Sequence, residues 1–124
     1  SSVIIHRSVL DEIGFFDQSL PACEDYDLWL RVASSYPVLY ISEKLVVKHG
    51  GHQDQLSEKY WGMDRFRIQA LEKIILSGNL IDENLNNAKQ MLREKTIIFS
   101  TGARKRGRTA EAEKCEQRME AILG

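Results

Sequence analysis

The chain has 124 residues, a formal net charge of −1 at pH 7, and 43% hydrophobic and 28% charged residues. This composition is typical of a globular protein with one modest core. It excludes the strong basic excess that most nucleic-acid binders carry, so we expect no nucleic-acid partner. No apolar run approaches the ~18 residues of a membrane span and no signal peptide opens the chain, so we expect a cytoplasmic protein. Cys23 and Cys115 are expected to be reduced thiols, with a disulfide as the alternative.

The first residues predict a strand and a short helix. The β-branched run Val3–Ile5 favours a strand. Ser8, with Asp11 three residues later, resembles a capping box, and Gly14 ends the helix that follows. Because the chain enters a strand directly after Ser1 without an initiator methionine, we expect it to be a fragment of a longer protein.

A second helix is predicted over residues 24–34, where early acids suit the helix dipole. Its expected buried stripe is Leu28, Trp29, Val32 and Ala33. Pro37 prevents continuation of the helix. Residues 38–41 and 45–47 then read as two short strands, and residues 48–55 as a polar loop with two glycines.

The remainder is predicted to be helical. Apolar residues at helical spacing lead to a stop at Ser77-Gly78-Asn79. Asp82 is expected to cap a long helix that ends near Gly107, and Thr109 to cap a last helix. These two helices should form an antiparallel hairpin whose turn carries the basic cluster 104–108. The predicted fold class is therefore α+β and mostly helical.

One motif carries most of the functional information. Residues 24–31 read Glu-Asp-Tyr-Asp-Leu-Trp-Leu-Arg, and residues 14–17 upstream read Gly-Phe-Phe-Asp. Together they resemble the acceptor-side half of family-2 glycosyltransferases, enzymes of the GT-A fold. The resemblance implies that residues 1–57 are an incomplete GT-A-type α/β half with short strands. Residues 58–124 would then be a helical extension that matches no signature.

The same resemblance implies roles for the two adjacent acids. Asp25 would be the catalytic base, and Glu24 a neighbour that orients it or the acceptor. Adjacent like charges can also raise the pKa of one member of the pair. The alternative is a pair of first-turn acids on a solvated helix. Asp25-Tyr26-Asp27 also spells the D-x-D metal signature, but it opens an amphipathic helix instead of following an apolar strand, so we do not assign a metal to it.

The glycine loop contains a candidate metal site. His49, His52 and Asp54 carry side chains that can bind divalent metals. The resemblance implies that a histidine here completes the shell of Mn²⁺ or Mg²⁺ or contacts the diphosphate. His52 comes close to the family's H-x-x-x-x-x-S pattern, with one residue fewer before Ser57, and His49 competes with it. A polar surface loop is the alternative, and a metal-dependent hydrolase is a further one.

Several other side chains could bind substrate. Trp29 could be a platform for a sugar ring, or simply a core residue. Arg31 could reach the diphosphate, or pair with Glu24 or Asp27. The cluster 104–108 could hold anionic lipid headgroups, or be a solvated turn.

The resemblance implies a nucleotide-sugar-dependent, inverting transferase. Its acceptor would be a glycan, such as a cell-surface polysaccharide, or a protein. The donor would bind mostly through the missing N-terminal half, so the isolated chain is expected to be inactive. Peripheral contact with the inner face of the membrane and a homodimer are considered as well. The competing hypothesis is a non-catalytic helical interaction module that retains a transferase-like scaffold.

Overall fold

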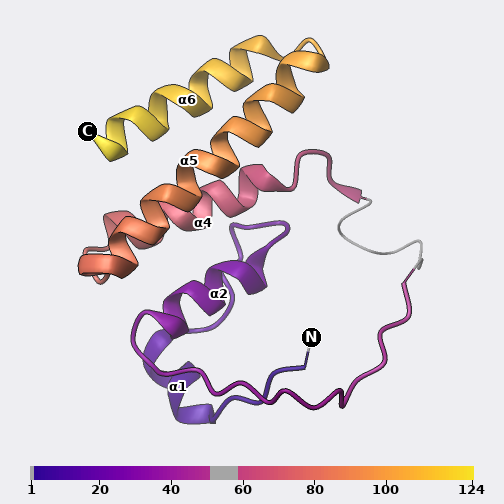
Figure 1. The fold of residues 1–124 in the computed structure, drawn as a ribbon, viewed down its shortest axis with the longest axis vertical. Helices are drawn as coiled ribbons and strands as arrows, with labels where there is room; N and C mark the ends of the chain where they lie inside the picture. Colours follow the sequence, from indigo (N-terminus) through magenta and orange to yellow (C-terminus); the bar gives the residue numbers. More distant parts are fainter. Residues whose placement is uncertain (1, 51–58) are drawn as a thin grey trace.

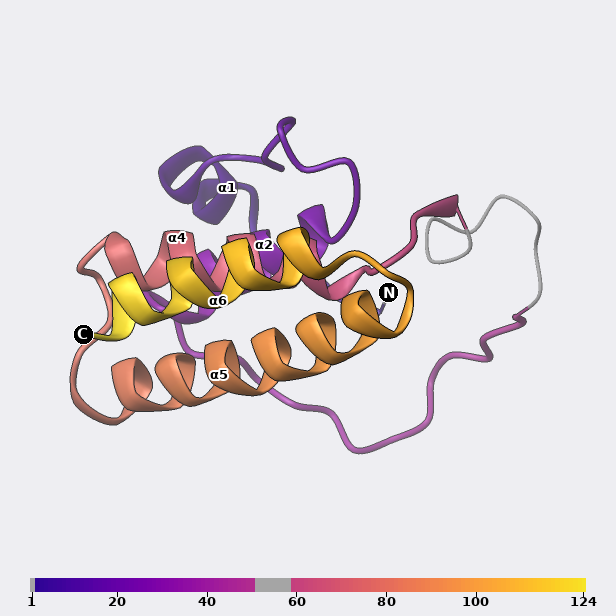
Figure 2. The ribbon, with the colours of Figure 1, turned by 90° about the horizontal axis from the view of Figure 1, so that it is seen from above.

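The computed structural model describes residues 2–50 and 59–124, and these residues form five α-helices (Figure 1). The helices are α1 (Arg7–Ile13), α2 (Glu24–Ala33), α4 (Asp64–Leu76), α5 (Asp82–Lys105) and α6 (Thr109–Leu123). Helices α5 and α6 form the antiparallel hairpin that the sequence predicts, and α4 packs against α5. Helix α2 packs on the other side of α4, and α1 contacts α2 (Figures 1 and 2).

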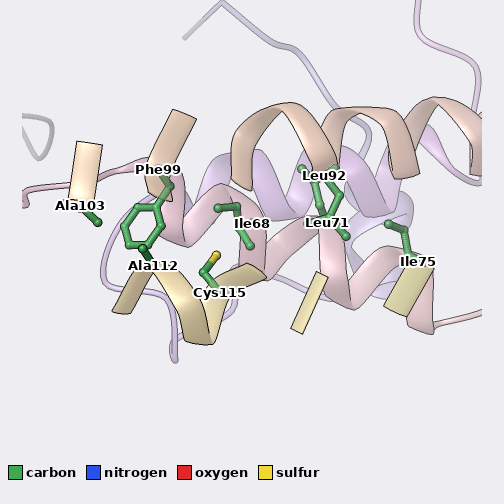
Figure 3. Close-up of a cluster of buried hydrophobic side chains, with 8 residues drawn as sticks. All are labelled: Ile68, Leu71, Ile75, Leu92, Phe99, Ala103, Ala112 and Cys115. Atoms are coloured by element: carbon green, nitrogen blue, oxygen red, sulfur yellow. The ribbon is translucent and has the colours of Figure 1, made fainter. Parts of the chain in front are cut away.

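The main core lies between α4, α5 and α6 (Figure 3). It consists of Ile68, Leu71, Ile75, Leu92, Phe99, Ala103, Ala112 and Cys115. Ile68 and Leu92 are completely buried, and burying a side chain of this kind stabilises a fold by about 1.5–3 kcal/mol. Tyr26 and Leu30 of α2 pack against the same cluster. Helix α2 therefore shares a core with the helices that follow it, although the predicted division at residues 57 and 58 stays a prediction.

The helix ends differ in detail from the predicted caps. His6, and not Ser8, caps α1, because its Nδ1 accepts a hydrogen bond from the Ser8 backbone N–H at 3.2 Å. Ser8 is therefore inside the helix. Gly14 ends α1 with a φ of 90°, a conformation that glycine adopts without strain. Asp82 and Thr109, which we expected to cap α5 and α6, are instead the first helical residues, and the N-caps are Ile81 and Arg108, one position earlier.

The predicted strands are wrong. No strand is present in the part of the chain that the structure describes, so the α+β class and the GT-A-type α/β half are replaced by an all-helical arrangement of these residues. Residues 38–41 and 45–47 lie in an irregular segment whose apolar side chains are exposed, Leu39 by 94% and Val47 by 80%. A β-branched run favours extended backbone, but a strand also needs a neighbour to satisfy its N–H and C=O groups. These segments have no such neighbour among the described residues.

None of the helices in residues 2–50 and 59–124 combines the length and the apolar character needed to cross a bilayer.

An ion pair across the hairpin yields a testable pH dependence. Arg104 of α5 donates two hydrogen bonds of 2.6 Å to the Glu116 carboxylate of α6, and these lower the pKa of Glu116 from 4.5 to about 2. A lowered pKa in the folded state means that the pair contributes stability above the unfolded pKa of Glu116 and that this contribution is lost as the pH falls.

We expect the difference in free energy of unfolding between wild type and Glu116→Gln to be constant above about pH 5. It should fall towards zero between pH 4.5 and about 2, as measured by urea unfolding at each pH. A difference that does not change with pH would contradict this prediction.

Candidate active site

The adjacent acids Glu24 and Asp25 form the first turn of α2. Glu24 is half-buried and Asp25 is exposed. The Tyr26 backbone N–H donates a hydrogen bond of 2.7 Å to Oδ1 of Asp25. The helix dipole favours negative charge at this end. The exposed Asp25 carboxylate is thus held on a regular helix where a ligand from solvent can reach it.

Cys23 connects this turn to the start of α4. It adopts a left-handed conformation, with φ 58° and ψ 25°, which is strained for a residue other than glycine. Its side chain is buried, and its Sγ donates a hydrogen bond of 3.7 Å to the Met63 carbonyl at the start of α4. Burial raises the pKa of the Cys23 thiol, so the thiol is a packing group that holds the beginning of α2 against α4.

Asp27, one turn into α2, is buried between two cations. Arg31 Nε lies 3.0 Å from Asp27 Oδ2, and Lys73 Nζ of α4 lies 2.7 Å from Asp27 Oδ1. Lys73 also contacts Asp17 in the loop before α2. Burial by itself would lower the pKa of Lys73, but its hydrogen bonds to Asp17 and Asp27 raise it. The hydrogen bond from Lys73 holds the pKa of Asp17 far below its usual range. Both oxygens of Asp27 are therefore committed to protein partners.

Arg31 uses its remaining nitrogens to hold the loop that follows α1. Its Nη1 donates to the Ile13 carbonyl at 3.0 Å, and its Nη2 donates to the Phe15 carbonyl at 2.6 Å. Of the two pairing partners considered from the sequence, Asp27 is the one observed. The alternative role in binding substrate stays a prediction, because no ligand contact tests it.

The buried face of α2 differs from the predicted stripe. Leu28 and Val32 are buried as expected, but Ala33 is exposed and Trp29 is half-buried. Asp27, which is not part of the predicted stripe, is buried as well. The ion pairs with Arg31 and Lys73 compensate for the cost of burying this charge. The role of Trp29 as a platform for a sugar also stays a prediction.

The histidines are not brought into a metal site by the described residues. His49 is exposed in the irregular segment after α2, and His52 and Asp54 lie outside the described residues. Within residues 2–50 and 59–124, no group of three or more His, Cys, Asp or Glu side chains could hold a metal ion.

Part of the chain is similar to known proteins. A protein of Rickettsia felis is 34% identical over 58 residues, which are 47% of this chain and 10% of that protein. Proteins of Rickettsia conorii and Rickettsia bellii are 31% and 36% identical over similar lengths and are covered to 9% and 8%. All three are named uncharacterised glycosyltransferases.

The chain thus spans at most a tenth of the length of the curated relatives it matches. No family model and no solved structure matches the chain. The similarity is to a segment of glycosyltransferases, and it indicates neither family 2 nor the GT-A fold.

Sequence reasoning missed Lys73. The four-residue spacing of Asp27 and Arg31 predicts an ion pair on one helix face. Lys73, however, lies 46 residues after Asp27 in the sequence. It belongs to a helix whose charged residues resemble ordinary solvated ones. No local pattern marks such a long-range partner.

Removing the buried charge tests this network. We expect Asp27→Asn to lower the free energy of unfolding by about 3 kcal/mol, because Arg31 and Lys73 lose a buried partner. The matched control is Asp11→Asn, which breaks the exposed Arg7–Asp11 pair and should cost less than ~0.5 kcal/mol. Urea unfolding measures both variants. Equal effects would mean that the network contributes no more than a surface pair.

Proposed function

We propose that the protein containing this chain is a nucleotide-sugar-dependent, inverting glycosyltransferase, with Asp25 as its catalytic base. The observation that carries the proposal is the partial similarity to three proteins named glycosyltransferases. The motif of residues 24–31, which resembles family 2, supports it. The accessible position of Asp25 at the start of α2 suits a base that must meet an acceptor from solvent.

In the proposed reaction, the Asp25 carboxylate accepts the proton of an acceptor hydroxyl. The acceptor oxygen forms a bond to the anomeric carbon of the donor sugar. The bond from that carbon to the nucleoside diphosphate breaks on the opposite face, and the electron pair leaves with the diphosphate. Attack and departure on opposite faces invert the anomeric configuration. Glu24 would orient Asp25 or the acceptor, and the rigid helix would keep the base within hydrogen-bond reach.

The proposal includes a divalent cation, Mn²⁺ or Mg²⁺, at the donor diphosphate, as the family resemblance implies. The described residues contain no cluster that fits such an ion. No step is therefore assigned to a metal held by these residues. Loss of transfer after EDTA treatment, with recovery on adding Mn²⁺, tests this part of the proposal in the complete protein.

The proposed acceptor is a glycan or a protein, and synthesis of a cell-surface polysaccharide fits the first of these. The donor would bind mainly through parts of the protein outside this chain. We therefore expect the 124-residue chain alone to transfer no sugar.

A second candidate function is a helical interaction module without catalysis. The large exposed apolar side chains of α5 favour it, because Ile97 is 61% and Ile98 57% exposed on a helix whose other face is in the core. In that case Glu24 and Asp25 would be ordinary surface acids.

Substitution of the proposed base separates the two functions. In the complete protein, Asp25→Asn should lower the rate of sugar transfer by about 100- to 10,000-fold, because the amide cannot accept the hydroxyl proton. The exposed carboxylate of Asp11 on α1 provides a matched control, and Asp11→Asn should retain normal transfer. Circular dichroism and the melting temperature should be unchanged in both variants. Full transfer activity in Asp25→Asn would exclude Asp25 as the base.

A further inference from the structure

A small basic pocket lies between the start of α4 and the last turns of α5. Its cavity has a volume of about 190 Å³, and its walls include Trp61, Asp64, Arg67, Gly102 and Arg106. Pockets for whole drug-sized ligands usually measure about 300–1,000 Å³. This pocket is smaller, so it is suited to one compact chemical group.

The walls of the pocket carry more positive than negative charge. Arg67 and Lys95 both pair with the same carboxylate, that of Asp64, at 2.8 and 3.3 Å. Arg106 donates a hydrogen bond of 2.9 Å to the Gly102 carbonyl, a neutral acceptor that leaves its charge in place. The walls thus carry two arginines and one carboxylate, and that carboxylate also pairs with Lys95 outside the walls, so an anion in the pocket would restore the balance.

Aromatic side chains hold two further arginines beside the pocket. The guanidinium carbon of Arg108 lies 4.0 Å from the Trp61 ring centroid, and that of Arg65 lies 4.7 Å from it. Phe99 stacks with Trp61, with centroids 5.9 Å apart. Nε of Arg65 is buried and has no hydrogen-bond partner among the residues that the structure describes. Because cation–π contact leaves the charge of a guanidinium intact, Arg65 adds to the positive potential. Arg108 adds less, because it is also paired with Glu111 at 3.2 Å.

Two glycines allow the walls to come this close. A Cβ on Gly62, whose φ is 60°, would lie 3.2 Å from the Phe99 ring. A Cβ on Gly102 would lie 3.1 Å from Nη1 of Arg106. Helix interiors normally disfavour glycine by about 1 kcal/mol relative to alanine. At Gly102 the missing side chain leaves the space in which the Arg106 guanidinium folds back over α5.

The pocket adjoins the start of α2. Met63 lines it, and the Met63 carbonyl accepts the hydrogen bond from Cys23, the residue directly before Glu24. Arg67 and Asp64 also lie close enough to the Tyr26 phenol to act on its pKa, which burial raises. The basic pocket and the proposed base are thus held by the same junction between α2 and α4.

We infer that this pocket binds a single phosphate group, belonging to a phosphate ester that serves as the acceptor. Guanidinium groups match the oxygens of phosphate with paired, charge-assisted hydrogen bonds. Arg106 would be the main ligand, because its only hydrogen bond among the described contacts goes to a backbone carbonyl. Arg67 would contribute while remaining paired with Asp64. The inference rests on the proposed transferase function for the role of the phosphate, but the binding itself can be measured without catalysis.

The first experiment measures binding to the complete protein by titration calorimetry. The probes are inorganic phosphate, a soluble alkyl phosphate, and phosphatidylcholine vesicles with and without phosphatidic acid. We expect Arg106→Gln to weaken phosphate binding by about tenfold or more, the usual value of hydrogen bonds to a charged group. The matched control is Arg93→Gln, which removes the same charge from an exposed site on α5 and should leave the affinity nearly unchanged.

Gly102→Ala separates binding from stability. The added methyl group should displace the Arg106 guanidinium and weaken phosphate binding. The melting temperature should stay the same or rise, because alanine favours the helix. A merely structural arginine would not produce this opposite change.

Each outcome has a defined meaning. Binding of soluble phosphates that depends on Arg106 supports the site with a free phosphate ester as its ligand. Binding of phosphatidic acid vesicles alone, lost in Arg106→Gln, supports it with a lipid headgroup as the source of the phosphate. The inference is overturned if wild type binds none of the probes, or if Arg106→Gln and Arg93→Gln lose equal affinity.

Transfer assays keep this inference distinct from the proposed function. Arg106→Gln should raise KM for the acceptor with little change in kcat, whereas Asp25→Asn should lower kcat and retain phosphate binding. Phosphate binding that depends on Arg106, together with full activity in Asp25→Asn, would reject the base and retain the pocket.

Discussion

The arrangement of this chain depends on one buried carboxylate. Asp27 is only 1% exposed, and a charge buried to this extent is tolerated only with close partners. Arg31, on the same helix, donates a hydrogen bond to the Asp27 carboxylate. It also donates hydrogen bonds to two carbonyls at the end of α1 and in the loop that follows. Lys73, on α4, forms an ion pair with the Asp27 carboxylate and a second one with Asp17. A single side chain thus connects the loop, α2 and α4. Because loss of either cation would leave charge unpaired in the core, the three segments hold one another in place.

This connection determines how the start of α2 is presented. Helix α2 is attached to α4 at two points, through Cys23 and Met63 at its first turn and through Asp27 and Lys73 one turn later. Tyr26 and Leu30 add apolar contacts with the main core. A carboxylate mounted on a helix fixed in this way has little freedom to move, and such rigidity is what a catalytic base requires. The basic pocket around Trp61 uses the same junction, so the proposed base and the proposed phosphate site would share one support.

Local pattern was a good guide to the helices and a poor one to the strands. The apolar spacing and the stops at Gly14 and Ser77-Gly78-Asn79 located helices to within a few residues, because the hydrogen bonds of a helix are made inside the segment itself. Residues 38–41 and 45–47 have the composition of strands, but in the described part of the chain they remain exposed and unpaired. The hydrogen bonds of a strand are made with another segment, and local composition cannot supply that partner.

The amino-acid sequence by itself determined the helical half of the fold, the hairpin of the last two helices, and the motif that resembles a glycosyltransferase. These features depend on neighbours within a few residues, where spacing is informative. Only the tertiary structure decided that Asp27 is buried, that Lys73 is its partner, and that arginines from α4 and from the turn after α5 gather around Trp61. The physical reason is separation along the chain. Charged side chains on a helix look alike in sequence whether they meet solvent or a distant partner, and packing brings the partners together.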